Sequence, residues 1–365
     1  MSPELLYLLR RRIGASGPLR FDEFMEVVLY GDPHGYYRNH VPGADFDYET
    51  SPTLTPWFGR LVLQELEAVW EQLESPEEFT VVEVGGGNGD LAAAAVASVE
   101  GRFEKALRWV FVEPIDTVTK LQRYRLGSSE RYSWVESLDE LSPITGIVLA
   151  HEVLDNFPFR LFEVEKDGAK EVRVGTARHH LTEVLFPIGP EIAELAAPAL
   201  EHLEEGDRFE LRTGVNAWVA SAARVLERGN LLVVDYGQIE PEIWTRHPSG
   251  SMVTYQRGEL GVDPFDNLGG ADITAHVNFS ALDRAAQDAG LHVLPIQTQK
   301  GWLEKLGLGE VVAELRRQAT RAQAENRHAD YMRYLAERSR VELLGARGGL
   351  GDYLVFTAEK PAGAG

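Results

Sequence analysis

Short apolar runs rich in β-branched residues alternate along this chain with longer stretches in which apolar side chains recur every three or four positions. The short runs predict strands, and the longer stretches predict helices. This alternation is typical of a mostly parallel, doubly wound α/β sheet. We expect its strands at 79–84, 108–112, 132–135, 147–150, 231–235, 291–297 and 353–357, and its helices at 56–73, 89–99, 115–124 and 279–289.

Segments outside this alternation suggest how the chain is divided. Two short helices are expected at 4–16 and 21–30, and the polar, irregular stretch 36–51 is typical of a lid or binding loop. The expected parts are an N-terminal helical segment with the lid (1–75), the α/β core (76–160 and 226–365, with a helical insertion at 301–345), and an inserted subdomain (160–225) that begins with short strands at 161–164 and 171–174.

Composition limits the classes of partner. The chain has 36 Lys and Arg against 57 Asp and Glu, a net charge of −21 that repels phosphate backbones, so nucleic acid is not expected. It has no cysteine, which excludes disulfides and thiolate zinc sites, and its histidines lack metal-binding spacing, so no metal is expected. No apolar run approaches the roughly 18 residues of a spanning helix, so no membrane insertion is expected. The N-terminus has its charges after its apolar residues, the reverse of a signal peptide, and we expect a cytoplasmic protein.

The stretch with the clearest chemistry is Glu83-Val84-Gly85-Gly86-Gly87-Asn88-Gly89-Asp90, which follows a β-branched strand and precedes a helix. A strand–loop–helix unit of this kind is a nucleotide site. A dinucleotide site needs G-x-G-x-x-G, and Asp90 stands where its last glycine would be. The pattern is instead E-x-G-x-G-x-G, formed by Glu83, Gly85, Gly87 and Gly89. A carboxylate before glycines that allow close approach suits a cationic ligand such as S-adenosylmethionine.

Acidic residues stand at the ends of four expected strands, where ligands of open α/β sheets bind. Besides Glu83 these are Glu113, Glu152 and Asp235. Glu113, after the second strand, is placed to accept hydrogen bonds from both ribose hydroxyls, although it could also be a solvated loop charge.

The run His151-Glu152-Val153-Leu154-Asp155-Asn156-Phe157-Pro158 follows the fourth strand. If a helical turn starts there, Glu152 and Asp155 share one face. Such a pair can bind a cationic amine or guanidinium and help to remove its proton, or it can cap a helix N-terminus. His151 is a candidate base, and a hydrogen-bonded structural histidine is the alternative.

Two weaker candidates complete the cofactor site. Thr50, Ser51 and Pro52 stand where the lid would contact the cofactor, or they form a turn that caps the following helix. Asp139, after the third strand, is placed to meet an adenine amino group, although Ser137 to Glu140 is also a plausible helix start.

Taken in order, these motifs resemble the MidA-like S-adenosylmethionine-dependent methyltransferases, whose mitochondrial members assist assembly of respiratory complex I. The resemblance covers nearly the whole chain, and its most distinctive part is the run from His151 to Pro158. Its glycine loop reads Gly-Gly-Gly-Asn-Gly-Asp where the family has Gly-Pro-Gly-x-Gly-Thr, and Thr53 stands where an acidic residue is usual.

This resemblance implies a Rossmann-like, seven-stranded class I methyltransferase sheet with an added helical N-terminal segment and an inserted mixed subdomain. It implies N-methylation, on an arginine of a protein subunit in the mitochondrial relatives. Carried over by position, Glu152 and Asp155 would face the substrate, and the residues at or near the cofactor would be Gly85, Gly87, Gly89, Glu113, Thr50, Ser51 and Pro52.

The sequence therefore favours an S-adenosylmethionine-dependent methyltransferase that acts on a side-chain nitrogen, that of arginine, in a partner protein such as a respiratory-complex-type subunit. Two alternatives stay open: a small-molecule O- or N-methyltransferase, and an assembly factor that binds S-adenosylmethionine without turnover. The acidic net charge allows a basic peptide partner, and a homodimer is compatible with the sequence.

Overall fold

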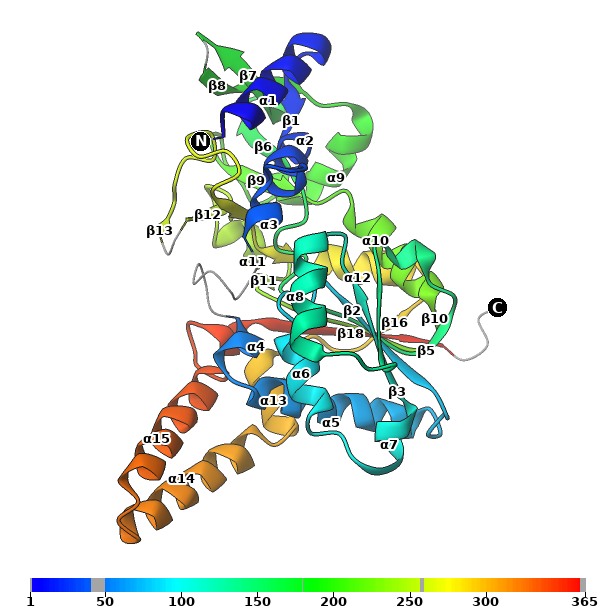
Figure 1. The fold of residues 1–365 in the computed structure, drawn as a ribbon. Coiled ribbons are helices and arrows are strands. Elements are labelled where there is room, and N and C mark those ends of the chain that lie inside the picture. The colour runs from blue at the N-terminus through cyan, green and yellow to red at the C-terminus, as the bar shows by residue number, and fades with distance from the viewer. Residues whose placement is uncertain (1, 41–49, 179, 257–258, 362–365) are drawn as a thin grey trace. The chain divides into compact units, whose positions relative to one another are not determined.

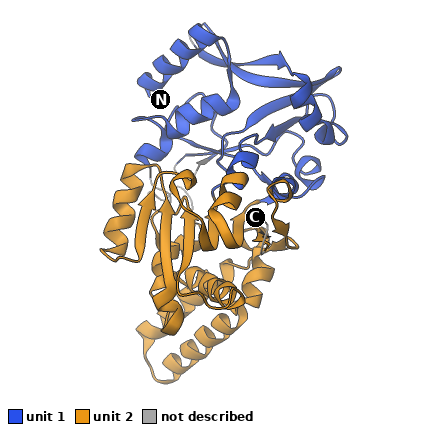
Figure 2. Ribbon diagram, turned by 90° about the vertical axis from the view of Figure 1, so that its right-hand side faces the viewer, with its two compact units in different colours: residues 1–48, 153–219, 237–285 blue, residues 49–152, 220–236, 286–365 orange. Residues whose placement is uncertain are grey.

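The computed structural model describes residues 2–40, 50–178, 180–256 and 259–361 (Figure 1). The chain forms two compact units, each assembled from several segments of sequence (Figure 2). Unit 1 comprises residues 1–48, 153–219 and 237–285. Unit 2 comprises residues 49–152, 220–236 and 286–365.

Unit 2 contains the main sheet, whose strand order is β4–β3–β2–β5–β10–β18–β16. The first five of these strands run parallel, and β18 is antiparallel to its neighbours. The strands are β2 (Phe79–Val84), β3 (Leu107–Val112), β4 (Tyr132–Val135), β5 (Ile144–His151), β10 (Leu226–Asp235), β16 (His292–Val293), β17 (Gln297–Thr298) and β18 (Leu354–Lys360).

This order confirms the expected doubly wound α/β fold, although the sheet has eight strands rather than seven. The strand expected at 291–297 is wrong in one respect, because it is split into β16 and β17, which both pair with β18. Pro295 lies between them, and proline has no N–H to donate to a ladder. The two pieces occupy one edge of the sheet.

The helices of unit 2 follow the expected alternation closely. The segment expected to be helical at 301–345 forms three helices, of which α14 and α15 make a hairpin that extends away from the sheet (Figure 1). The elements are α4 (Ser51–Leu54), α5 (Trp57–Gln72), α6 (Asp90–Val96), α7 (Gly101–Ala106), α8 (Asp116–Leu126), the 3₁₀ turn η2 (Leu138–Glu140), α13 (Gln299–Lys305), α14 (Leu308–Ala324), α15 (His328–Leu343) and the 3₁₀ turn η3 (Leu350–Asp352).

The core of unit 2 forms where α5 packs against the sheet. Its apolar positions recur with helical spacing, and Phe58 and Leu66 are completely buried against the same cluster as Trp109 and Leu149 of the strands. Burying each such side chain stabilises the fold by about 1.5–3 kcal/mol. This packing fixes the strands whose C-terminal ends carry the candidate site.

Unit 1 contains a smaller antiparallel sheet of order β1–β7–β6–β9, with β8 paired to β7. Sequence patterns predicted β6 and part of β7 but not β8 or β9. The elements of this sheet are β1 (Leu19–Arg20), β6 (Arg160–Glu165), β7 (Gly168–Ala177), β8 (His180–Pro187) and β9 (Arg208–Leu211).

Helices and short strands complete unit 1. The boundary between the units in the sequence falls inside two of the helices. These two are α10 (Val215–Val225) and α12 (Phe279–Asp288). The others are α1 (Pro3–Ser16), α2 (Phe21–Met25), the π-helix η1 (Glu26–Tyr30), α3 (Tyr36–Asn39), α9 (Pro190–Leu200), α11 (Glu242–Thr245), β11 (Gly237–Gln238), β12 (Val253–Gln256), β13 (Glu259–Leu260), β14 (Asp272–Thr274) and β15 (Val277–Asn278).

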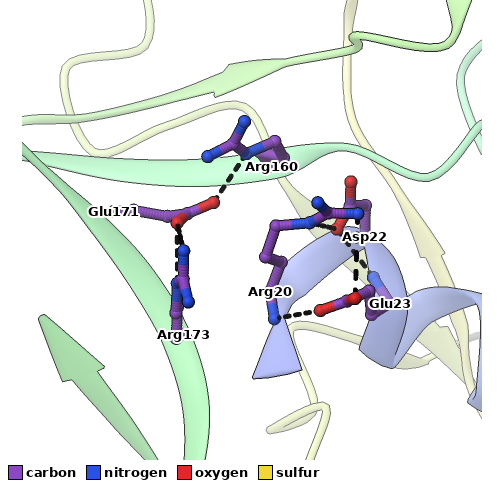
Figure 3. A network of polar contacts seen from close by, with 6 residues as sticks. All are labelled: Arg20, Asp22, Glu23, Arg160, Glu171 and Arg173. Carbon is purple, nitrogen blue, oxygen red and sulfur yellow. Dashed lines mark hydrogen bonds and ion pairs between the residues drawn. The ribbon is translucent and has the colours of Figure 1, made fainter. Parts of the chain in front are cut away.

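An ion-pair network stabilises the small sheet (Figure 3). The carboxylate of Glu171 is 1% exposed, and it accepts hydrogen bonds from Arg160 at 2.6 Å and from Arg173 at 2.7 Å. Because both oxygens of the buried carboxylate have guanidinium partners, the cost of removing its charge from water is offset. The network thereby ties β6 to β7.

The N-terminal expectations need two corrections. The helix expected at 21–30 changes from α-helix to π-helix at Glu26. The lid expected over 36–51 begins as the helix α3, because Tyr36 and Tyr37 are buried, and residues 41–49 lie outside the described part of the chain.

Candidate functional site

The C-terminal ends of the parallel strands in unit 2 form one continuous rim. Val84 at the end of β2 pairs with both Val112 of β3 and Ala150 of β5. The residue after each strand donates its backbone N–H to a neighbouring strand: Gly85 to Val112 at 3.1 Å, Glu113 to Val135 at 2.9 Å, and Glu152 to Val234 at 2.9 Å. The glycine loop, Glu113 and Glu152 therefore lie side by side at the edge where ligands of α/β sheets bind.

The glycine loop turns the chain from β2 into α6. Gly85, Gly87 and Gly89 all have positive φ, at 62°, 50° and 82°, a conformation that side chains with a Cβ adopt only with strain. The N–H of Gly89 closes the turn onto the carbonyl of Gly86 at 2.9 Å. The loop ends at the N-terminus of α6, so backbone donors and a positive helix end converge there.

Two side chains fix the surroundings of the loop. Gln122, on α8 and completely buried, donates to the carbonyl of Gly87 at 2.9 Å and accepts from the indole N–H of Trp134 at 2.9 Å. Glu113 is buried at the end of β3, and its carboxylate accepts from the N–H of Ile115 at 3.0 Å. An ionised carboxylate accepts hydrogen bonds and donates none, which is the chemistry that ribose hydroxyl donors need.

Glu83 is buried next to Gly86 of the loop. Its side chain is 3% exposed and accepts a hydrogen bond from the indole N–H of Trp109 at 2.8 Å. Burial raises the pKa of Glu83 to about 8, and the hydrogen bond from Trp109 only partly opposes that shift. At neutral pH the group is therefore mostly a neutral acid, and its expected attraction for a cationic ligand is correspondingly weak.

This burial predicts how stability changes with pH. Because the pKa of Glu83 is about 8 in the folded chain and near 4.5 when unfolded, the folded chain keeps a proton that the unfolded chain releases over this window. Stability contributed by Glu83 therefore falls as pH rises from about 4.5 to about 8. Glu83→Gln removes the titration and keeps an oxygen for Trp109, so we expect the variant to gain stability relative to wild type as pH rises.

Urea unfolding of both proteins at several pH values across that window measures the difference directly. A free-energy difference between variant and wild type that does not change with pH would show that Glu83 titrates normally. The amide can also change the free energy of unfolding by an amount that does not depend on pH. That amount does not affect how the difference between the two proteins changes with pH.

Glu152 adopts an unusual backbone conformation directly after β5. Its φ is +52°, and no helix begins there, so the condition under which Glu152 and Asp155 would share one helical face is not met. The N–H of Glu152 donates to the carbonyl of Val234, which extends the pairing with β10 one residue beyond the strand. Its Oε2 lies 3.5 Å from the hydroxyl of Tyr353.

His151 is a poor candidate for a base. It is buried, its ring packs against Phe58 with centroids 4.9 Å apart, and its Nδ1 lies 3.5 Å from Glu152 Oε1. Burial lowers the pKa of His151 to about 3, so the ring is neutral at physiological pH and binds a proton weakly. These properties favour the structural alternative for this residue.

Asp155 belongs to unit 1, whereas Glu152 belongs to unit 2. The backbone of Asp155 is held firmly, because its carbonyl accepts from the N–H of Ala275 at 2.9 Å and from the guanidinium of Arg212 at 2.6 Å. Arg212 also donates to the carbonyl of His276 at 2.7 Å. The joint action of Glu152 and Asp155 on a substrate stays a prediction.

The remaining cofactor candidates have clear local roles. Asp139 lies in η2, where its exposed carboxylate pairs with Arg224 at 2.5 Å and accepts from Ser221 at 3.2 Å. Ser51 and Pro52 begin α4, and the N–H of Thr50 donates to the hydroxyl of Thr53 at 2.9 Å. Asp139 thus lies at a helix start, as its alternative interpretation held, whereas Thr50, Ser51 and Pro52 begin a short helix of their own rather than a turn that caps α5. The contacts of these residues with a cofactor stay predictions.

Three side chains near the rim were not predicted from the sequence. Gln122 lies inside α8 and Gln299 is the first residue of α13, and neither belongs to a motif. Gln122 contacts Gly87 and Trp134, and Gln299 contacts Ser51, which is 248 positions away. Tyr353 precedes the last strand and reaches Glu152 across 201 positions. The sequence shows only that these residues lie on a helix or next to a strand end. Many other residues have such positions, so this feature could not single them out.

These features fit S-adenosylmethionine. The positive-φ glycines leave room for a ligand against the backbone, and the anchored carboxylate of Glu113 suits the ribose hydroxyls. Within the described residues no group of three or more His, Asp or Glu is arranged to hold a metal ion. None of the helices described is both long and apolar enough to cross a membrane. Sheet order and site together define the class as a Rossmann-like, class I methyltransferase fold.

Comparison with known proteins identifies the family. Residues 61–297 match the family model of S-adenosyl-L-methionine-dependent methyltransferases named Methyltransf_28, which is more than half of the chain. The chain belongs to this family. It is therefore an S-adenosylmethionine-dependent methyltransferase, as the sequence predicted.

Individual relatives cover most of the chain. It is 27% identical over 339 residues to the human mitochondrial protein arginine methyltransferase NDUFAF7, covering 84% of this chain and 74% of the relative. The Drosophila melanogaster homologue is 26% identical over 317 residues, covering 77% and 70%. A crystal structure from Burkholderia thailandensis, bound to S-adenosyl-homocysteine, superposes with a TM-score of 0.86 at 25% identity, covering 98% of this chain and 94% of that one.

Proposed function

We propose that this methyltransferase acts on a guanidino nitrogen of arginine in a partner protein. The observation that carries the proposal is the position of Glu152, whose backbone lies at the sheet rim with the glycine loop and Glu113, and whose carboxylate is 10% exposed. The relatives named above support it, because those proteins are described as protein arginine methyltransferases.

The cofactor and the protein supply different parts of the methyl-transfer reaction. S-adenosylmethionine supplies a methyl group on a sulfonium, whose sulfur keeps the bonding electron pair when the acceptor nitrogen forms the new bond. The acceptor nitrogen must lose one proton, and we propose that Glu152 orients the guanidinium and accepts that proton. Gly85, Gly87, Gly89 and Glu113 would hold the cofactor, with Glu83 buried next to the loop.

The finer assignments are extensions of this proposal. Asp155 would contribute to acceptor binding, and Thr50, Ser51, Pro52 and Asp139 would contact the cofactor. The acceptor would be a protein subunit, with a basic segment favoured by the net charge of −21. A homodimer and a cytoplasmic location stay predictions, and the named relatives are described as mitochondrial.

The proposal predicts where a methyl label goes. When the protein is incubated with methyl-labelled S-adenosylmethionine and lysate from its own source, we expect label in a small number of protein bands. Glu152→Gln removes the proton acceptor and should lower the labelling rate by about 10²–10⁴-fold while leaving S-adenosylhomocysteine affinity unchanged. Lys105→Gln, on the surface helix α7, serves as a charge-removing control.

Other outcomes separate the alternatives. Label found only in the small-molecule fraction would contradict a protein acceptor and support a small-molecule methyltransferase. Cofactor binding without labelling of any fraction would contradict turnover and support an assembly factor.

A further inference from the structure

Glu152 and two tyrosines come together where the ends of three neighbouring strands of the main sheet meet at the rim. His151 of β5 pairs with Val234 of β10, and Asp235 of β10 pairs with Leu354 of β18. Glu152 and Tyr236 each follow one of these paired residues, and Tyr353 precedes another. Because paired strands lie about 4.8 Å apart, this register alone gathers the three side chains at one place.

The contacts among these side chains agree with the register. The rings of Tyr236 and Tyr353 have centroids 5.6 Å apart and are tilted by 48°. The hydroxyl of Tyr353 lies 3.5 Å from Glu152 Oε2, a long hydrogen bond of the kind that often shortens when a ligand binds. Both tyrosines are half-buried, so part of each remains accessible.

The backbone of Glu152 is strained to reach this position. A positive φ of 52° costs a residue with a Cβ on the order of 1 kcal/mol, and in this conformation the N–H of Glu152 donates to Val234. Asparagine or glycine would accept this φ at lower cost. A long acidic side chain in a strained conformation beside two aromatic rings indicates a binding function rather than a turn alone.

We propose that Glu152, Tyr236 and Tyr353 form the subsite that binds the planar guanidinium of the acceptor. The carboxylate accepts guanidinium N–H donors, the tyrosine rings pack against the guanidinium plane, and the Tyr353 hydroxyl orients the carboxylate. This inference rests on the proposed arginine acceptor and adds Tyr236 and Tyr353 as residues that determine acceptor specificity.

The arrangement distinguishes among acceptors by charge and shape. A carboxylate acceptor would be repelled by Glu152. A lysine ammonium would satisfy the carboxylate, but it has no plane to pack against the rings. Citrulline has nearly the shape of arginine but no charge, so it separates packing from charge-assisted hydrogen bonding.

The test measures binding to the full chain saturated with S-adenosylhomocysteine. The probe is N-acetyl-arginine amide, titrated at roughly millimolar concentration and followed by saturation-transfer NMR. We expect Tyr353→Leu and Tyr236→Leu each to weaken probe binding about tenfold, and Tyr353→Phe, which keeps the ring, to weaken it less than about threefold. Tyr124→Leu, which changes a tyrosine that is 88% exposed on α8, should have no effect.

Several results would overturn the inference. These are no binding of the arginine probe to the wild-type protein, equal binding of N-acetyl-citrulline amide, or unchanged binding in both leucine variants. Because the citrulline comparison uses only wild-type protein, equal binding of the two probes would overturn the inference even if a leucine variant fails to fold, and Tyr353→Phe tests the ring with the smallest change to the fold. S-adenosylhomocysteine affinity of each variant shows whether the fold at the rim is intact.

The inference and the proposed function fail in different ways. If wild-type protein and both leucine variants form methylarginine in protein equally well, the subsite is wrong and the arginine acceptor stands. If label reaches only other acceptors, the arginine acceptor itself is wrong.

Discussion

Replacing Gly87 with valine should lower the affinity for S-adenosylhomocysteine by about 100-fold or more. Gly87 has a φ of 50°, and a β-branched residue avoids that conformation, so the loop would relax to a different backbone path. We expect the relaxed loop to lose several backbone hydrogen bonds to the cofactor, each contributing about 1 kcal/mol. The backbone carbonyl of residue 87, which accepts a hydrogen bond from Gln122, would move as well. Isothermal titration measures the change.

A control variant shows whether backbone strain alone, away from the glycine loop, changes cofactor affinity. Gly101 has a φ of 69°, and an added Cβ would meet nothing within 4 Å. Gly101→Val should therefore cost a similar amount of stability without changing cofactor affinity. If Gly87→Val is folded and binds S-adenosylhomocysteine as tightly as wild type, the glycine loop is not the cofactor site.

Replacing Glu113 with alanine should weaken cofactor binding by at least about 100-fold. The buried carboxylate is the acceptor proposed for both ribose hydroxyls, and each hydrogen bond to a charged group contributes about 1.5–3 kcal/mol. Glu113→Gln keeps an oxygen for the N–H of Ile115 and should lose only about tenfold. Comparing the alanine and glutamine variants therefore separates the effect of the carboxylate charge on cofactor affinity from the effect of the hydrogen bond to Ile115.

The ribose provides a second readout for Glu113. Wild-type protein should discriminate against a 2′-deoxy analogue of S-adenosylhomocysteine, and Glu113→Ala should lose that discrimination. Glu78→Ala, which removes an exposed carboxylate just before the opposite end of β2, should change neither quantity. Unchanged discrimination in Glu113→Ala would assign the ribose to another residue.

The main sheet could be predicted from the sequence because its strands carry their own signal. Val81, Val82 and Val84 form a β-branched run that ends at glycines, and such local patterns fix strand, loop and helix together. The same reasoning located Glu113, since a strand end is also a local feature. The split of the edge strand is likewise local, and Pro295 could have predicted it.

The surroundings of the candidate site could not be predicted in this way. The N–H of Glu152 donates to Val234 of another strand, and its neighbour Tyr353 comes from the far end of the chain. The neutral state of Glu83 depends on burial beside Trp109, which a motif alone does not reveal. In each case tertiary packing, rather than local sequence, decides the chemistry of the side chain.

The most direct test of the account is the chemical identity of the methylated group. Protein from the lysate is labelled with methyl-labelled S-adenosylmethionine, hydrolysed in acid, and its amino acids are separated. The account predicts label in methylarginine, and a loss of that label when Glu152→Gln replaces the wild-type protein. Label in methyl-lysine or in small molecules alone, with S-adenosylhomocysteine still bound, would contradict it.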